Sequence, residues 1–253
     1  MPPETVAATS VDLLVFGPHP DDIEIGLGGV VARHVDLGFR VGLCDLTAGE
    51  MGSNGTVEER LAEAEAARAV LGAAWRMNLR WPDRAIGGAD HVRSAAALIR
   101  QARPRTVGIP YWSDRHPDHV SASQVLTEAV FNAALRRFDP STDPWKPQWI
   151  CYYFINDSVP PSFVVDVSSA YEKKRRSLAC YASQFRPAAS DAVGTRLTSP
   201  RFQQLIESRD AQFGALAGVG FAEGVIVRDP IVRPTLFVDQ AGGGTTPPAS
   251  VQK

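Results

Sequence analysis

The chain has 253 residues and a formal net charge of −2 at pH 7, with 26 lysine and arginine residues against 28 aspartate and glutamate residues. This balance argues against binding to nucleic acid or to an anionic membrane through a basic surface. A hydrophobic content of 44% excludes disorder as the main state, and no apolar run approaches the roughly 20 residues that span a bilayer. We therefore expect a folded protein with a small-molecule partner, and with neither nucleic acid nor membrane as a partner.

The cysteines and the start of the chain indicate the compartment. Cys44, Cys151 and Cys180 are scattered, and no Cys-x-x-Cys pair occurs. This excludes a zinc site built from clustered thiolates and favours reduced thiols in a cytoplasmic protein. Residues 1–10 lack the basic start and apolar centre of a secretory signal, and we expect them to be flexible.

Short apolar strands alternate with helices along most of the chain. The expected strands are residues 11–16, 40–46, 75–79, 106–110, 149–155 and 163–167. The expected helices are 26–37, 56–72, 92–102, 119–137, 170–181 and one that begins at Ser199-Pro200. Thr56 and Glu59 have the spacing of a capping box at a helix start. This alternation predicts an α/β, Rossmann-like fold, with a mostly parallel sheet and helices on both faces.

The domain organisation follows from the same pattern. We expect a single α/β domain over residues 11–239, whose last part is a C-terminal α/β extension. Residues 240–253 lack core side chains and are rich in Gly, Thr, Pro and Ser, so they are expected to form a disordered tail.

Three of the five histidines lie in two short motifs that follow the first and fourth expected strands. Residues 18–22 read Pro-His-Pro-Asp-Asp, and residues 116–119 read His-Pro-Asp-His. In a parallel sheet with strand order 3-2-1-4-5, strands one and four are neighbours where the order reverses. Ligands bind outside the carboxyl ends of the strands at that point. The two motifs should therefore face each other across one crevice.

Imidazole and carboxylate groups in this pattern indicate a metal site. A catalytic zinc ion takes three protein ligands and keeps one position open for water. Because Asp21 and Asp22 are adjacent, their side chains diverge. One of them can then bind the metal while the other accepts a proton from the metal-bound water. The spacing alone does not decide whether His116 or His119 is a ligand.

The motifs resemble those of the PIG-L/LmbE family of zinc-dependent N-deacetylases. The resemblance covers about residues 11–238. It is closest to the N-acetylglucosaminyl-malate deacetylases of bacillithiol biosynthesis and to similar deacetylases of chitooligosaccharides or N-acetylglucosamine. Its supporting segments are Asp45–Glu50, Ser53–Thr56, Asn78-Leu79, Pro82–Arg84 and Ser183–Phe185. It implies Zn²⁺-dependent removal of an acetyl group from an N-acetylglucosaminyl compound. It also implies a homo-oligomer, either a trimer or a hexamer.

The same resemblance implies a role for each motif residue. The zinc ligands would be His19, Asp22 and His119. Asp21 would be the general base that activates the attacking water. His116 would be either the acid or the electrostatic partner of the tetrahedral intermediate, and Asp118 would hold the tautomer of His116. Charge stabilisation at the oxyanion of such an intermediate typically contributes several kcal/mol.

Substrate contacts are expected from the loop after the second strand and the helix that follows it. Arg60 resembles the family's substrate-binding arginine, since a guanidinium can hold a hydroxyl or carboxylate in two hydrogen bonds. The alternative is a solvated arginine that pairs with Glu63. The loop would contribute Glu50, Ser53 and Asn54. Asp83 and Arg84 are expected to pair with each other at the pocket rim. Residues 200–203 contain no tyrosine, although some relatives supply one to the oxyanion from this region.

Three other functions are compatible with parts of the sequence. Gly26-x-Gly28-Gly29 is similar to part of a dinucleotide fingerprint, but the turn after the first strand carries two carboxylates that would repel a pyrophosphate. Two histidines and one carboxylate also form the facial triad of non-haem Fe(II) enzymes. A metal-binding protein without turnover would need the same ligands. The additional carboxylate of Asp21 favours hydrolysis.

Overall fold

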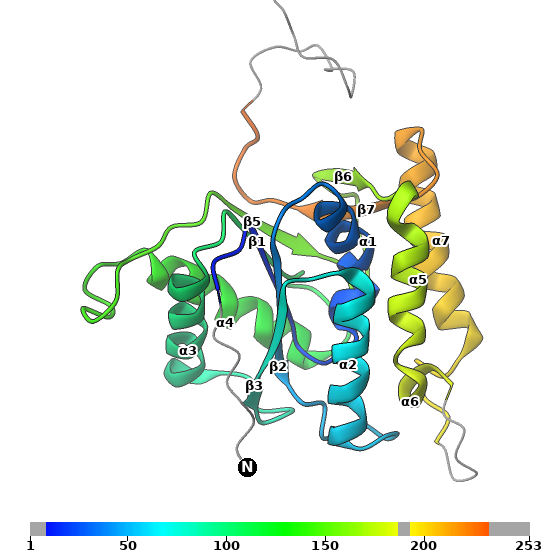
Figure 1. The fold of residues 1–253 in the computed structure, drawn as a ribbon, viewed down its shortest axis with the longest axis horizontal. Coiled ribbons are helices and arrows are strands. Elements are labelled where there is room, and N and C mark those ends of the chain that lie inside the picture. The colour runs from blue at the N-terminus through cyan, green and yellow to red at the C-terminus, as the bar shows by residue number, and fades with distance from the viewer. Residues whose placement is uncertain (1–8, 187–192, 233–253) are drawn as a thin grey trace, which may run out of the picture.

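The computed structural model describes residues 9–186 and 193–232. The expected tail, residues 240–253, and most of the expected flexible N-terminus lie outside these ranges. Within them the strands form one sheet in the order β3-β2-β1-β4-β5-β7-β6 (Figure 1). The strands are β1 Leu13–Gly17, β2 Val41–Thr47, β3 Trp75–Trp81, β4 Thr106–Pro110, β5 Trp149–Tyr153, β6 Phe163–Asp166 and β7 Ala222–Ile226.

The sheet combines a parallel core with an antiparallel edge. β1 pairs in parallel with β2 and β4, and the parallel pairing continues to β3 on one side and β5 on the other. The predicted order 3-2-1-4-5 is therefore confirmed. β7 runs antiparallel to both β5 and β6. The sequence analysis missed β7, because the strand is short and carries Glu223, a charged residue that is only 1% exposed.

Helices cover both faces of the sheet, as predicted for this α/β fold. α3 and α4 pack on one face, and α1, α2, α5 and α7 pack on the other (Figure 1). The helices are α1 Asp22–Asp36, α2 Val57–Leu71, α3 Gly88–Ala102, α4 Pro117–Ala133, α5 Tyr171–Ala179, α6 Ala182–Phe185 and α7 Pro200–Ala217, with a 3₁₀ turn, η1, at Ser168–Ala170. Among the described residues, no helix is both long enough and apolar enough to cross a bilayer.

Both histidine motifs lie at helix starts, which corrects two expected boundaries. α1 begins at Asp22 rather than at Gly26, so the first motif supplies its first turn. α4 begins at Pro117 and ends at Ala133, before the expected end. His116 caps α4, because its Nδ1 atom accepts a hydrogen bond from the backbone N–H of Asp118 at 3.2 Å. A helix start fixes the direction of the side chains that follow it, and here these include the candidate metal ligands.

The glycines after the first motif serve close packing. A Cβ atom at Gly26 would lie 2.2 Å from the ring of Tyr153 and 2.8 Å from the carbonyl oxygen of Phe154. Only glycine therefore allows α1 to approach the end of β5 this closely. The Tyr153 hydroxyl continues the contact to β1 by donating a hydrogen bond to the Phe16 carbonyl at 2.7 Å. Close packing therefore accounts for Gly26, the first glycine of the segment that was similar to a dinucleotide fingerprint.

The capping box of α2 is confirmed and gives a stability prediction. The Glu59 N–H donates to the Thr56 hydroxyl at 3.1 Å, and the Thr56 N–H donates to the Glu59 carboxylate at 2.8 Å. We expect Thr56→Ala to lower the free energy of unfolding by about 1 kcal/mol, since an orphan N–H loses its acceptor. Urea denaturation measures this loss. Thr56→Ser keeps the acceptor and should be close to wild type; equal stability of the alanine variant would contradict the assignment.

Candidate active site

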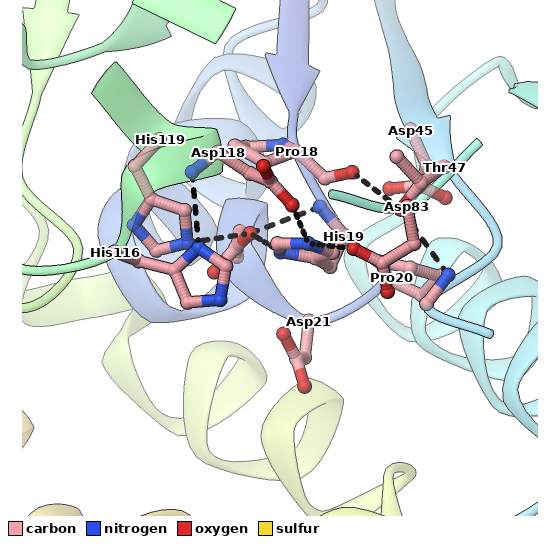
Figure 2. Close-up of polar contacts among 12 residues, drawn as sticks. Pro18, His19, Pro20, Asp21, Asp45, Thr47, Asp83, His116, Asp118 and His119 are labelled. Atoms are coloured by element: carbon pink, nitrogen blue, oxygen red, sulfur yellow. Dashed lines mark hydrogen bonds and ion pairs between the residues drawn. The ribbon is translucent and has the colours of Figure 1, made fainter. Parts of the chain in front are cut away.

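The two histidine motifs converge at the carboxyl ends of β1 and β4, as the strand order requires (Figure 2). The ring centroids of His19 and His116 lie 4.9 Å apart, and those of His116 and His119 lie 4.7 Å apart. The centroids of His19 and His119 are separated by 5.6 Å. The expected crevice is therefore present, and all three histidines line one cavity.

Asp22 lies between two of these imidazoles. Its Oδ2 atom is 3.1 Å from Nδ1 of His19 and 3.3 Å from Nε2 of His119. On the far side of each ring another carboxylate contacts the remaining nitrogen. Asp83 Oδ1 lies 3.1 Å from Nε2 of His19, and Asp114 Oδ1 lies 3.0 Å from Nδ1 of His119. The two histidines thus have the same arrangement, each held between Asp22 and a carboxylate behind it.

This arrangement is the one that metal-ligating histidines adopt. Such an imidazole binds the ion through one nitrogen and donates the proton of the other to a carboxylate, which fixes the tautomer. Here Asp83 and Asp114 each contact one nitrogen of a ring. The other nitrogen, Nδ1 of His19 or Nε2 of His119, faces Asp22. Ligand atoms around a tetrahedral zinc ion with bonds of about 2.0–2.1 Å lie about 3.3–3.4 Å apart. The distances from Oδ2 of Asp22 to these two nitrogens, 3.1 and 3.3 Å, are close to that value, so Asp22 lies where a ligand beside each histidine would lie.

Two groups of residues offer donor atoms that all lie within 4.8 Å of one another. They are His19 with His116 and His119, and His19 with Asp83 and Asp118. The first group contains both histidines that contact Asp22. Asp118 is already bound by Arg84, through the backbone N–H at 3.0 Å and the guanidinium at 3.2 Å. Nδ1 of His116 accepts the helix-capping hydrogen bond. These existing contacts favour the group centred on Asp22.

The charges of the cluster are arranged to hold a cation. Burial opposes ionisation of Asp22, but His119 and His19 hold its pKa well below the usual range. Burial likewise disfavours the charged form of His119, yet Asp22 and Asp114 raise its pKa to about 9. The carboxylates are therefore ionised at neutral pH and stabilise positive charge on the imidazoles. A metal ion that binds here displaces protons, so its affinity increases with pH.

Asp21 occupies a strained position on the wall of the same cavity. Its φ angle is 112°, a left-handed conformation that non-glycine residues rarely adopt. Burial raises the pKa of Asp21 to about 7, although the guanidinium of Arg60, 3.3 Å away, lowers it. A carboxylate whose pKa lies near neutrality can both accept and release a proton, which is what a general base requires.

His116 is oriented differently from the sequence-based expectation. The backbone N–H of Asp118, rather than its carboxylate, contacts Nδ1 of His116, and the carboxylate lies 3.5 Å from Nε2 of His19 instead. Burial and the neighbouring His119 and His19 lower the pKa of His116. An Nδ1 atom that accepts a hydrogen bond carries no proton, so the structure favours a neutral ring with its proton on Nε2. That N–H is available as a donor.

The expected substrate contacts divide into cavity and loop residues. The cavity has a volume of about 440 Å³ and Ser53 lines it. The Glu50 carboxylate accepts a hydrogen bond from the Asp83 N–H at 2.6 Å. The Asn54 side chain bonds both the N–H and the carbonyl of Val193 at 2.9 Å. Glu50 and Asn54 therefore connect loops and lie outside the cavity lining, whereas Ser53 lines the cavity.

Arg60 is buried, not solvated, at 5% exposure. Its guanidinium donates to the carbonyls of Pro20 at 2.6 Å and Gly49 at 3.1 Å, and it contacts Asp21. The alternative pair with Glu63 does not form, because that carboxylate accepts hydrogen bonds from Ser183. Most donors of Arg60 are thus used within the protein, which fits a residue that positions Asp21 and contributes an edge to the cavity.

The sequence analysis missed the role of Asp114 and wrongly paired Asp83 with Arg84. Asp83 contacts His19 and the Met51 N–H, and Arg84 contacts Asp118. Asp114 is held by the backbone and side-chain amides of Asn156, at 3.0 and 2.9 Å. Each of these residues follows the carboxyl end of a parallel strand. Applying the strand-end rule to β3 and β5 would have identified Asp83 and Asn156, and applying it to the whole loop after β4 would have identified Asp114.

Comparisons with known proteins identify the family of the chain. A family model described as PIG-L, GlcNAc-PI de-N-acetylase, matches residues 14–130, which contain both histidine motifs. The crystal structure of the conserved protein TT1542 from Thermus thermophilus is 34% identical with a TM-score of 0.81, and the match covers 90% of this chain and 100% of that one. The chain belongs to the PIG-L family. It is a deacetylase of that family with a candidate His/Asp metal site.

Two named relatives indicate where the chain stands within the family. Diacetylchitobiose deacetylase of Thermococcus kodakarensis is 29% identical over 84% of this chain and 81% of its own length. The 1D-myo-inositol 2-acetamido-2-deoxy-alpha-D-glucopyranoside deacetylase of Rhodococcus erythropolis is 30% identical over 55% of this chain and 60% of its own. Both differ from the N-acetylglucosaminyl-malate type, so these relatives do not support that part of the expected resemblance.

The carboxylate behind His119 gives a prediction for metal affinity. Asp114→Asn removes the negative charge that fixes the tautomer of His119, and we expect it to weaken Zn²⁺ binding by about 10- to 100-fold. Competition with a chromophoric chelator measures the affinity. Asp157→Asn is the matched control, since that carboxylate accepts the N–H of Arg115 in the same loop as Asp114 and, among the described residues, is bound to no histidine of the site. Unchanged affinity in the Asp114 variant would show that Asp114 does not support a ligand.

Proposed function

We propose that this chain is a Zn²⁺-dependent hydrolase that removes the acetyl group from an N-acetylglucosaminyl compound. The observation that supports this most directly is the position of Asp22 between Nδ1 of His19 and Nε2 of His119. These three residues would hold the ion. When bound, zinc polarises the acetamide carbonyl and lowers the pKa of its water to about 7.

Asp21 and His116 supply the proton transfers and the charge stabilisation. Asp21 accepts a proton from the attacking water as its oxygen adds to the acetamide carbon. The Nε2–H of His116 donates a hydrogen bond to the carbonyl oxygen as that atom becomes negative, a contribution that is typically several kcal/mol. Asp21 then returns the proton to the amine nitrogen as the C–N bond breaks. The products are acetate and a free amine.

The substrate we propose is a small amino sugar whose N-acetyl group enters the cavity. The relatives support this class, because their names specify diacetylchitobiose and an inositol-linked N-acetylglucosamine. A cavity of about 440 Å³ is of the size that small-molecule sites have. The group attached to the sugar distinguishes the candidates, and the malate of the bacillithiol pathway is one of them.

Two other functions use the same ligands. A non-haem Fe(II) enzyme binds its metal through two histidines and one carboxylate, and a protein that only stores or senses metal needs nothing further. Neither has a use for a second buried carboxylate of raised pKa beside the ligands, as Asp21 provides. Oxygen consumption by the iron-loaded protein would favour the first of them.

We propose that a single deacetylase domain, residues 11–239, carries out this reaction in the cytoplasm. Assembly into a trimer or hexamer stays a prediction from the family resemblance.

Acetate release tests the proposed substrate class. The purified protein should release acetate from at least one of diacetylchitobiose, N-acetylglucosamine, N-acetylglucosaminyl-inositol and N-acetylglucosaminyl-malate. Chelation should abolish the activity, and added Zn²⁺ should restore it, because the ion supplies the Lewis acid. Release that persists in the metal-free protein would overturn the metal assignment. No release from any of the four would overturn the substrate class.

Asp21→Asn separates the general base from the metal site. We expect a loss of kcat of about 10²- to 10⁴-fold, the usual contribution of a positioned base, with the zinc content unchanged. Asparagine tolerates the left-handed backbone at this position, so the fold should be retained. Asp12→Asn, at the opposite end of β1, is the control. Wild-type kcat in the Asp21 variant would exclude this residue as the base.

A further inference from the structure

α1 is broken just after the turn that carries Asp22. Leu27 has φ −135° and ψ 16°, which is outside the helical region. In a continuous helix the N–H of Gly29 would donate to the carbonyl of Ile25. Here the N–H groups of Gly29 and Val30 donate to the two carboxylate oxygens of Glu223, at 3.0 and 2.6 Å. The start of α1 is therefore a separate turn, whose position relative to the rest of the helix is set by other parts of the chain.

Two cationic side chains donate hydrogen bonds to the carbonyl group that the break in α1 leaves without its helical partner. The Ile25 carbonyl accepts hydrogen bonds from Lys174 at 3.0 Å and from Arg209 at 2.7 Å. Lys174 also contacts Asp210 and Glu223, each at 2.6 Å, and Arg209 contacts Asp210 at 3.0 Å. Two buried cations and two buried anions thus balance one another at the break. They come from α5, α7 and β7, which belong to the C-terminal extension (Figure 1).

Arg209 also reaches the other half of the site. Its Nη1 atom donates to the carbonyls of Phe154 and Ile155, both at 3.1 Å. Ile155 is followed by Asn156, which holds Asp114 behind His119. Ile25 and Ile155 both line the candidate cavity. One guanidinium therefore bonds the main chain on both sides of the site.

We propose that Arg209 is a positioning residue that fixes the separation of Asp22 and His119 through the main-chain carbonyls of Ile25 and Ile155. The inference rests on the proposed metal site, since these are two of its ligands. The planar guanidinium suits the role because its donors point in fixed directions and reach three carbonyls at once. A lysine ammonium keeps the charge that balances Asp210 but cannot span the same acceptors.

Zn²⁺ affinity of Arg209→Lys tests the proposal. The matched control is Arg100→Lys, because Arg100 is also buried and also donates to main-chain carbonyls, those of Ala133 and Leu135, away from the site. We expect affinity to fall by about 10-fold or more in the Arg209 variant, the size of effect that groups supporting a ligand produce, and to change less than about twofold in the control. Thermal melting checks that both variants are folded. An unchanged affinity in Arg209→Lys, or an equal loss in both variants, would overturn the proposal.

Hydrogen exchange separates a failure of this inference from a failure of the proposed function. If the wild type binds no zinc, the proposed metal site is wrong. Amide hydrogen exchange within residues 22–26 and 154–156 then decides the role of Arg209. Faster exchange in both segments of Arg209→Lys, with exchange in α3 unchanged, supports the proposed role. Unchanged exchange in the two segments overturns it. If Arg209→Lys does not fold, Asp210→Asn acts on the same arginine with little change of shape, because it removes the charge that the Arg209 Nε atom contacts at 3.0 Å. Loss of zinc affinity and faster exchange in both segments of Asp210→Asn would support the role of Arg209, and no change in either would overturn it.

Discussion

The structure depends on one carboxylate oxygen, Oδ2 of Asp22, which lies within 3.1 Å of His19 and 3.3 Å of His119. The adjacency of β1 and β4 brings the two motifs to this point, and the start of α1 at Asp22 aims its side chain between the rings. Charged groups that are buried in this way are costly unless they are paired or bind a metal. His19 and His119 each contact a second carboxylate, Asp83 or Asp114, on the ring nitrogen that faces away from Asp22. These carboxylates and imidazoles together are suited to bind a cation.

The C-terminal extension after β5 supports the position of Asp22, because its side chains bond the break in α1. Its buried residues Lys174, Arg209 and Glu223 replace the hydrogen bonds that α1 loses at Leu27. Asp210 contacts both cations and balances their charge. Breaking a helix and burying four charges would each destabilise the protein alone. Together they satisfy one another, because the free N–H and carbonyl groups of the break meet charges of opposite sign. The first turn of α1 can then take the orientation that the site requires.

Local sequence patterns predicted the parts of the protein that depend on neighbours along the chain. Strand order, the capping box at Thr56 and the convergence of the two motifs follow from hydrophobic periodicity and from the topology of parallel sheets. The break in α1, the partner of Asp118 and the support of His119 by Asp114 depend on contacts between distant segments, which periodicity does not contain. β7 was missed for a related reason. A glutamate in the sequence indicates an exposed position, and only the contacts of Glu223 with α1 and α5 explain why it is buried.

The location of the ion tests the central claim most directly. Anomalous diffraction at the zinc edge, from crystals of the zinc-loaded protein, gives the position of the metal without reference to activity. The account predicts one peak at about 2.0–2.1 Å from Nδ1 of His19, Oδ2 of Asp22 and Nε2 of His119, the distances that zinc adopts with such ligands. A peak coordinated instead by Asp83 and Asp118, with Asp22 outside bonding distance, would contradict it.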